Sequence, residues 1–201
     1  DPWFFNSGGP GSGLHITHDG GKNWKKVKAE DGFPKGDLGR IGIAIARNKP
    51  NVIYALVEAK KNGLYKSIDG GVTFVSIKGN LPNYSITDIA FDPNDDNVIV
   101  VTYGRYQNDN SKVFITTDQG ATWQNITYNL NKIPVRSVVI DHINASTIYL
   151  GTELGVYKKA MAKSSWSIYN QDLPNVAILE LEVMYGSNTI RAATWGRGLW
   201  E

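Results

Sequence analysis

Thr17-His-Asp-Gly-Gly-Lys-Asn-Trp24, Ser67-Ile-Asp-Gly-Gly-Val-Thr-Phe74 and Thr116-Thr-Asp-Gln-Gly-Ala-Thr-Trp123 are three copies of one eight-residue pattern. A fourth copy has decayed and keeps its register only through Ser165-Trp166 at its end. The aromatic ends fall at positions 24, 74, 123 and 166. A pattern that recurs in phase at such intervals predicts a repeated structural unit.

Each copy has the composition of a hairpin turn between two strands. A short carboxylate can accept backbone N–H bonds inside its own turn, and a glycine can take a positive φ. The terminal aromatic can fill the gap between neighbouring sheets. The residues expected to have these structural roles are Asp19, Gly21, Trp24, Asp69, Gly71, Phe74, Asp118, Gly120, Trp123 and Trp166.

Two further strand candidates precede each turn after the first, another pair follows the last turn, and none of the chain has convincing helical periodicity. The candidates are residues 41–45 with 52–57, 86–91 with 98–102, 137–140 with 147–150, and 179–183 with 189–193. A period of 43 to 50 residues matches a four-stranded blade. The sequence therefore predicts an all-β chain, a β-propeller of about four repeats built from four-stranded antiparallel blades.

The predicted organisation is a single propeller segment over residues 1–201, with a partial blade at 177–201. Residues 3–5 and 14–16 suggest strands b and c of a first blade, and residues 198–200 match strand c of the last. Three arrangements remain open: a piece of a larger propeller, which we favour, a ring closed by this chain alone, or a ring shared by two chains. The expected partners are thus the other blades of a parent propeller or a second copy.

Composition narrows the classes of function. The chain has 21 Lys+Arg against 19 Asp+Glu and no cysteine, so neither a nucleic-acid partner nor a disulfide framework is expected. No apolar run approaches the roughly 20 residues of a membrane span. The three histidines do not have the spacing of metal ligands, and residues 92–97 are better suited to a solvated turn than to calcium. No metal or cofactor is expected.

A ligand site is expected on the loops between the second and third strands of each blade, at the edge opposite the Asp-Gly turns. These b–c loops offer carboxylates, aromatics and guanidiniums that can stack on and hydrogen-bond to sugar rings. The candidates are Glu58, Tyr103, Arg105 and the adjoining Tyr106, Glu153, Trp195 and Arg197. The alternative is that Glu153 and Arg197 pair locally and that Trp195 only packs.

The repeated motif resembles the Asp-box, or bacterial neuraminidase repeat, of sialidases, xyloglucan-active glycoside hydrolases and the sortilin ectodomain. The whole chain is similar to exported Bacteroidetes proteins described as glycosyl hydrolases with sortilin-like repeats. The residues that carry this likeness are 39–43, 52–58, 151–157 and 193–201. The resemblance implies a secreted or cell-surface protein. Residues 2–74 resemble the interior of such proteins and residues 80–201 their C-terminal end, so any absent stretch would fall near Gly79-Asn80.

The expected function is glycan or protein binding on the b–c loop face, by a segment that is not catalytic by itself. One alternative is part of a polysaccharide-acting glycoside hydrolase, and another is a structural scaffold. A glycoside hydrolase needs two carboxylates roughly 5 to 10 Å apart. Glu58, Glu153 and Asp37 are conceivable, but no motif singles them out, and no catalytic residue is assigned.

Overall fold

The computed structural model describes residues 8–46, 49–130, 132–144, 146–187 and 189–201. These residues form β-strands and two short 3-10 segments, η1 (Ala29–Asp31) and η2 (Tyr128–Leu130). Within these ranges, no helix has the length and apolar character needed to cross a membrane. The chain divides between Gly79 and Asn80 into two compact units. The expectation that residues 1–201 form one propeller segment stays a prediction.

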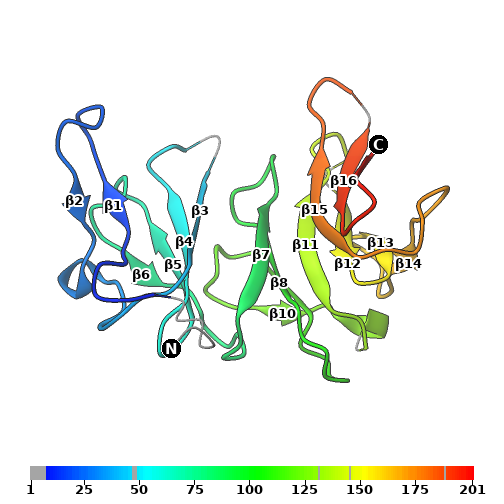
Figure 1. The fold of residues 1–201 in the computed structure, drawn as a ribbon, viewed down its shortest axis with the longest axis horizontal. Helices are drawn as coiled ribbons and strands as arrows, with labels where there is room; N and C mark the ends of the chain where they lie inside the picture. Colours follow the sequence, from blue (N-terminus) through cyan, green and yellow to red (C-terminus); the bar gives the residue numbers. More distant parts are fainter. Residues whose placement is uncertain (1–7, 47–48, 131, 145, 188) are drawn as a thin grey trace. The chain divides into compact units, whose positions relative to one another are not determined.

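Unit 1 contains a two-stranded and a four-stranded sheet (Figure 1). The first pairs β1 (His15–Ile16) with β2 (Lys25–Lys26). The second follows chain order through β3 (Ile41–Ile45), β4 (Ile53–Val57), β5 (Gly63–Ser67) and β6 (Val75–Ser76). The strand expected at residues 3–5 lies outside the described residues.

Unit 2 contains three antiparallel sheets, each also in chain order. Two have four strands, and the third has three. The strands are β7 (Ile86–Phe91), β8 (Ile99–Tyr103), β9 (Val113–Thr116) and β10 (Gln124–Asn125); β11 (Val135–Ile140), β12 (Thr147–Thr152), β13 (Gly155–Ala160) and β14 (Ser167–Ile168); and β15 (Ile178–Val183), β16 (Ile190–Thr194) and β17 (Leu199–Trp200).

Each four-stranded meander is a propeller blade, which confirms the predicted fold class. Because its strands are antiparallel and consecutive, the first and third connections lie at one end of the strands. The second connection lies at the opposite end. Within unit 2, β11 packs against β7 on one side and against β15 on the other. The first strands of successive sheets are therefore neighbours, as in a propeller.

The Asp-Gly turns are closed by their own side chains. The Oδ1 atom of Asp69 accepts the N–H of Thr73 at 3.0 Å, and its Oδ2 atom accepts the Thr73 hydroxyl at 2.6 Å. The Ser67 hydroxyl donates to Asp69 and accepts the N–H of Gly71, whose φ is 90°. Asp118 repeats the pattern with Thr122. The turn thus satisfies the polar groups that would otherwise be exposed when the hairpin reverses.

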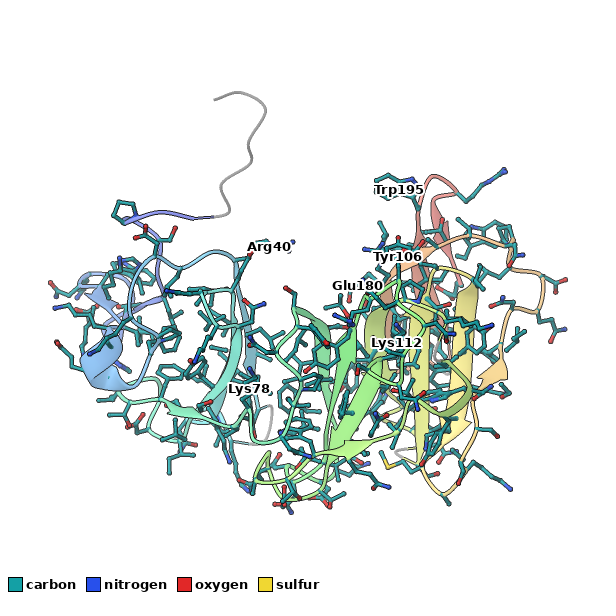
Figure 2. The ribbon with its side chains drawn as sticks, turned by 90° about the horizontal axis from the view of Figure 1, so that it is seen from below. Arg40, Lys78, Tyr106, Lys112, Glu180 and Trp195 are labelled. Carbon is teal, nitrogen blue, oxygen red and sulfur yellow. The ribbon has the colours of Figure 1, made fainter. Side chains whose placement is uncertain are left out.

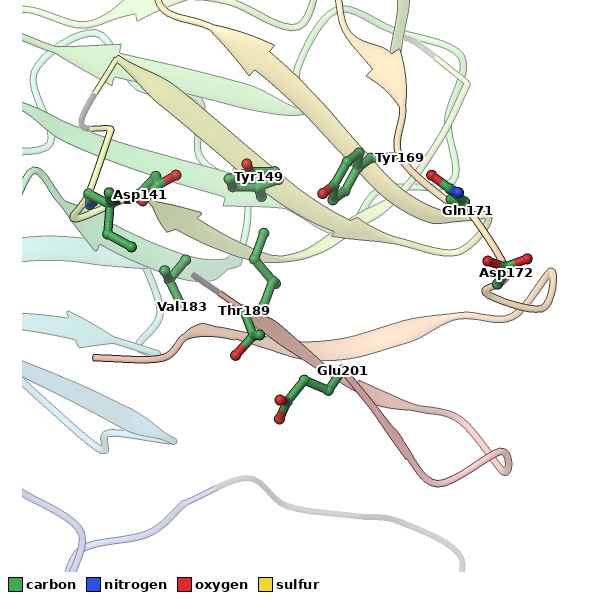
Figure 3. Close-up of a pocket in the computed structure, with 10 residues that line it drawn as sticks. Asp141, Tyr149, Tyr169, Gln171, Asp172, Val183, Thr189 and Glu201 are labelled. Carbon is green, nitrogen blue, oxygen red and sulfur yellow. Dashed lines mark hydrogen bonds between the residues drawn. The ribbon is translucent and has the colours of Figure 1, made fainter. Parts of the chain in front are cut away.

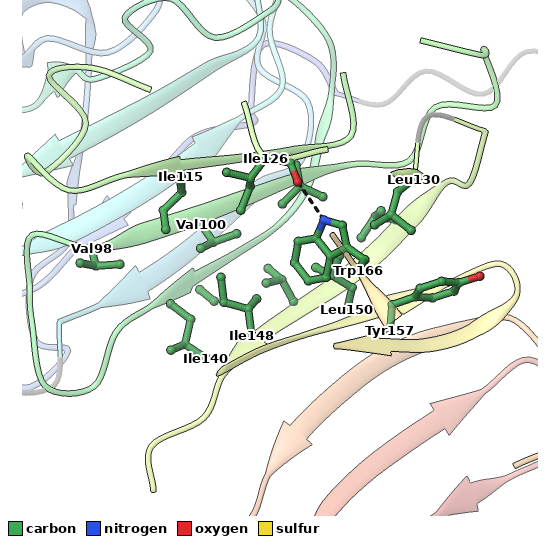
Figure 4. Packing of buried hydrophobic residues seen from close by; sticks show 14 residues of the cluster. Val98, Val100, Ile115, Ile126, Leu130, Ile140, Ile148, Leu150, Tyr157 and Trp166 are labelled. Atoms are coloured by element: carbon green, nitrogen blue, oxygen red, sulfur yellow. Dashed lines mark hydrogen bonds between the residues drawn. The ribbon is translucent and has the colours of Figure 1, made fainter. Parts of the chain in front are cut away.

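Three of the terminal aromatics, Phe74, Trp123 and Trp166, are buried. Trp166 lies in a core of residues from two successive sheets, and its Nε1 atom donates to the Ile126 carbonyl at 2.8 Å (Figure 4). The aromatic therefore joins its own sheet to the preceding one. Trp24 differs because its ring is 61% exposed and its Nε1 atom donates to Gly21 within its own turn.

The first strand of every sheet in unit 2 contains a register shift. The shifts fall between Ile86 and Asp88, between Val135 and Ser137, and between Ile178 and Glu180. Such a bulge re-aims the residue it contains. In β7 that residue is Thr87, whose hydroxyl donates to the Val135 carbonyl of β11 at 2.9 Å. In β11 it is Arg136, which reaches the loops described next.

Candidate ligand-binding edge of the second unit

The b–c edge of unit 2 comprises the loops at residues 104–112, 153–154 and 195–198, which join the second and third strands of the three sheets. Two of its aromatic residues, Tyr106 and Trp195, are labelled at the same end of unit 2 in Figure 2. Their side chains are 68% and 70% exposed, respectively. Their exposed ring faces are available to stack on a ligand.

Tyr106, Arg136 and Glu153 form a hydrogen-bonded cluster across two sheets. Arg136 donates from Nε to Glu153 Oε1 at 2.6 Å and from a terminal nitrogen to the Tyr106 hydroxyl at 3.0 Å. The Tyr106 hydroxyl also donates to Glu153 Oε1 at 3.1 Å. The hydrogen bond to Glu153 raises the pKa of the Arg136 guanidinium. The cluster therefore holds a charged donor and a charged acceptor in fixed positions at the surface.

Arg105 is held on both sides. Its guanidinium lies over the Tyr84 ring, 3.3 Å from the ring centroid, and a terminal nitrogen is 3.0 Å from Asp109 Oδ2. The stacking and the ion pair together keep the planar group from rotating freely. The loop at residues 104–112 thus has a defined shape near its exposed Tyr106.

Lys112 holds the backbone of this loop from the protein interior. Its side chain is completely buried, and its Nζ atom donates to the carbonyls of Arg105 and Gln107 at 2.7 and 2.6 Å. Asp109 Oδ1 lies 3.4 Å from the same nitrogen. A buried ammonium is tolerated only with such partners. These contacts use a charged group to fix loop backbone.

The other expected contact residues have different environments. Tyr103 is completely buried and packs edge-to-face on Phe114, so its ring supports the loop and does not reach the surface. The backbone N–H of Trp195 donates to the Ala177 carbonyl at 2.9 Å. Arg197 is exposed, and its carbonyl accepts the Trp200 indole N–H.

Glu58 lies in unit 1, on the equivalent loop of the β3–β6 sheet. Its Oε2 atom accepts the Arg40 N–H at 3.1 Å and lies 3.5 Å from Arg40 Nε. Glu58 and Glu153 therefore each pair with an arginine near the start of their sheet. They belong to separate units, so no carboxylate pair for hydrolysis is defined by them.

The acidic turn at residues 92–97 uses its oxygens internally. Asp92 Oδ1 accepts the Asn94 N–H at 2.8 Å, and Asp95 Oδ1 accepts the Asn97 N–H at 2.9 Å. Across the described part of the chain, no three His, Cys, Asp or Glu side chains are grouped so as to hold a metal ion.

Sequence patterns did not identify Arg136, Tyr84 or Lys112. Arg136 lies on a strand, and only the bulge beside it turns its side chain toward the b–c edge. Tyr84 precedes the sheet that carries the 104–112 loop, and Lys112 ends this loop; both contact the loop only once the chain has folded. The nearest sequence signal was the aromatic and basic content of residues 103–106.

The model of the family Sortilin-Vps10, described as sortilin, neurotensin receptor 3, matches residues 12–171. No curated protein sequence matches the chain. Among solved structures, the extracellular domain of a putative one component system from B. thetaiotaomicron superposes with a TM-score of 0.67 at 18% identity. The GH74 enzyme of Niastella koreensis superposes with a TM-score of 0.59 at 16% identity, and YCF48 bound to D1 peptide superposes with a TM-score of 0.61 at 15% identity.

Each of these structures resembles this chain in fold over nearly the whole length of this chain. The alignments cover 93%, 94% and 98% of this chain, respectively. They cover 24%, 31% and 60% of the other chains. The chain therefore spans less than two thirds of each of these structures, and at such identities the likeness concerns fold alone.

Proposed function

Because the chain belongs to the Sortilin-Vps10 family, whose members are Asp-box propellers, we propose that it is a segment of a secreted or cell-surface protein whose b–c edge binds glycans without catalysis by this segment. The extracellular location of one structural relative supports the export part of the proposal. The observation that carries the binding part is the pairing of two exposed aromatic rings with a fixed arginine–glutamate pair.

The chemistry of the b–c edge suits a sugar. An aromatic ring presents a flat apolar face to the C–H groups of a pyranose, and Tyr106 and Trp195 supply two such faces. Hydroxyl groups need donors and acceptors together, which Arg136 and Glu153 provide. The mixed character of the cluster favours a neutral, hydroxyl-rich ligand over a polyanion.

The loops at this edge are largely pre-organised. Lys112 fixes the backbone of the 104–112 loop, and Glu153 donates its N–H to the Pro134 carbonyl at 3.2 Å. A ligand that binds a rigid surface loses less free energy to ordering the protein. This favours measurable affinity from a small number of contacts.

The test is binding to a glycan array, followed by titration of the best glycan into wild type and variants. We expect Tyr106→Ala and Trp195→Ala each to weaken binding at least about tenfold, which corresponds to about 1.4 kcal/mol. Trp24→Ala is the matched control, because it removes another largely exposed tryptophan, from unit 1. Binding of a peptide but no glycan would instead identify a protein ligand. If every interaction survived both variants, the scaffold function would be favoured.

A glycoside hydrolase is the second candidate, favoured by the GH74 fold likeness. Its test is release of reducing ends from polysaccharides, compared between wild type and Glu153→Gln. Turnover that the variant abolishes would replace the binding proposal with catalysis. Binding without turnover supports the proposal as stated.

A further inference from the structure

Leu154 is an exposed apolar residue at the tip of the β12–β13 turn, directly after Glu153. The residue is 49% exposed. Its backbone is nevertheless held on both sides, because its N–H donates to Thr152 Oγ1 at 3.0 Å and its carbonyl accepts a hydrogen bond from Asn170 Nδ2 at 3.1 Å. The turn therefore presents a leucine to solvent in a defined position.

Asn170 fixes this turn from the segment that follows β14. Its Oδ1 atom accepts the Val156 N–H at 2.6 Å, while its amide nitrogen donates to the Leu154 carbonyl. The preceding residue, Tyr169, donates its N–H to the Val156 carbonyl at 2.8 Å. Tyr169 and Gln171 line a cavity of about 490 Å³ between the β11–β14 sheet and the β15–β17 sheet (Figure 3). The turn is thus tied to a segment that is itself paired with β13.

The arginine–glutamate pair beside this leucine keeps polar atoms available to a ligand. Arg136 directs Nε and one terminal nitrogen toward Glu153 Oε1, and that terminal nitrogen also donates to the Tyr106 hydroxyl. Among the described residues, neither the second terminal nitrogen of Arg136 nor Glu153 Oε2 has a hydrogen-bond partner. Both side chains are partly exposed, at 35% and 24%. The pair therefore offers one free donor group and one free acceptor in fixed positions.

From this arrangement we infer that Leu154 and the neighbouring hydrogen-bonded cluster form a subsite for an acetamido sugar, a sugar unit whose ring carries an N-acetyl group. The inference rests on the glycan binding proposed above and adds the substituent that the site selects. An acetamido group combines one N–H donor, one carbonyl acceptor and one methyl group. A hydroxyl group has no apolar part.

Each part of the substituent has a partner at this subsite. Glu153 Oε2 accepts the acetamido N–H, and the free nitrogen of Arg136 donates to the acetamido carbonyl. Hydrogen bonds to charged groups are stronger than those between neutral groups. Leu154 covers the methyl group, and the Tyr106 ring stacks on the C–H face of the sugar.

The corresponding turn of unit 1 has the charged pair without the apolar neighbour. Glu58 pairs with Arg40, but the residue that follows Glu58 is Ala59. Ala59 is partly buried and packs against the core of unit 1. A methyl group bound beside Glu58 would therefore find no exposed leucine, so the acetamido subsite is assigned to unit 2.

The probes are two trisaccharides with the same β-1,4 linkage, one of N-acetylglucosamine and one of glucose, titrated into the full chain. They differ only in the substituent at carbon 2 of each ring. We expect the N-acetylglucosamine trimer to bind at least about tenfold more tightly. Equal or tighter binding of the glucose trimer would overturn the acetamido subsite and leave glycan binding intact. Absence of binding to any glycan would overturn the proposed function as well.

A protein variant tests the role of the leucine. Leu154→Ala should weaken the N-acetylglucosamine trimer at least about threefold, because the methyl group loses its apolar contact, and should leave the glucose trimer within about twofold of wild type. Ile168→Ala is the control, since it removes an exposed aliphatic side chain from the outer strand β14 and should change neither affinity. An equal loss for both trimers would show that Leu154 only shapes the turn and would refute its part in selecting the substituent.

Discussion

At the scale of single residues, the aspartate of each Asp-Gly turn is stabilised in its ionised form by donors of its own turn. The Asn23 N–H lowers the pKa of Asp19 to about 2, and the Thr116 hydroxyl is the largest of several donors that lower the pKa of Asp118 to about 2. The Thr73 hydroxyl lowers the pKa of Asp69 further still. The same eight-residue motif therefore produces the same electrostatics three times.

Acid should destabilise the protein through these turns. The pKa values of these aspartates are lower in the folded state than in the unfolded state. The stability that the aspartates give to the fold is therefore complete above about pH 4 and is lost as the pH falls through about 2. Urea unfolding between pH 5 and 2 should show a falling midpoint. Asp118→Asn should flatten this decline. A variant whose midpoint falls as steeply as wild type would contradict the role of Asp118.

Truncation to alanine should lower the unfolding free energy far more at the buried tryptophan than at the exposed one. Trp166→Ala removes a buried indole and its hydrogen bond to Ile126, and should cost about 3 to 5 kcal/mol of unfolding free energy. Trp24→Ala should change it by about 0.5 kcal/mol or less, because the ring is largely in solvent. Denaturant unfolding monitored by circular dichroism measures both. Similar losses for the two variants would mean that Trp166 does not join the sheets.

At the scale of elements, the 104–112 loop depends on one buried ammonium. Lys112→Met keeps the volume of the stem but leaves the Arg105 and Gln107 carbonyls without their donor, at a cost of about 1 to 3 kcal/mol. Hydrogen exchange should accelerate in this loop. The outer turn at residues 117–122 should be unaffected and serves as the internal control. Unchanged exchange in the 104–112 loop would show that Lys112 does not order it.

The elements that sequence predicted best are those with local causes. Strands 41–45 and 86–91 were predicted with the bounds observed, because apolar runs between turn residues define them. The position of Arg136 could not be predicted, since it depends on a bulge that no local pattern marks. Tyr103 was expected on a loop, but β8 extends one residue beyond the predicted strand and buries it, leaving Tyr106 exposed.

At the scale of the whole molecule, neighbouring sheets of unit 2 are joined by polar as well as apolar contacts. Asp88 Oδ2 accepts the Val138 N–H of the next sheet at 2.8 Å. Burial raises the pKa of Asp88, although the N–H groups of Val138 and Ile89 oppose the shift. Its ionisation therefore opposes stability, unlike that of the turn aspartates.

Asp88→Asn should reveal this difference. With a raised folded pKa, the contribution of Asp88 is most favourable below its unfolded pKa and declines as the pH rises through the folded value. The unfolding free energy of the asparagine variant, relative to that of wild type, should thus be higher at pH 7 than at pH 3. Unfolding free energies of both proteins at the two pH values test this. The reverse order would show that the ionised carboxylate is the form the fold prefers.

The central claim is that the b–c edge, and not the edge with the Asp-Gly turns, is the binding surface. The most direct measurement is amide NMR or hydrogen-exchange mapping of unit 2 with the best array glycan bound. We predict that changes concentrate in residues 104–111, 153–154 and 195–198. Changes at residues 117–122 on the opposite edge, or none in the b–c loops under saturation, would contradict the account.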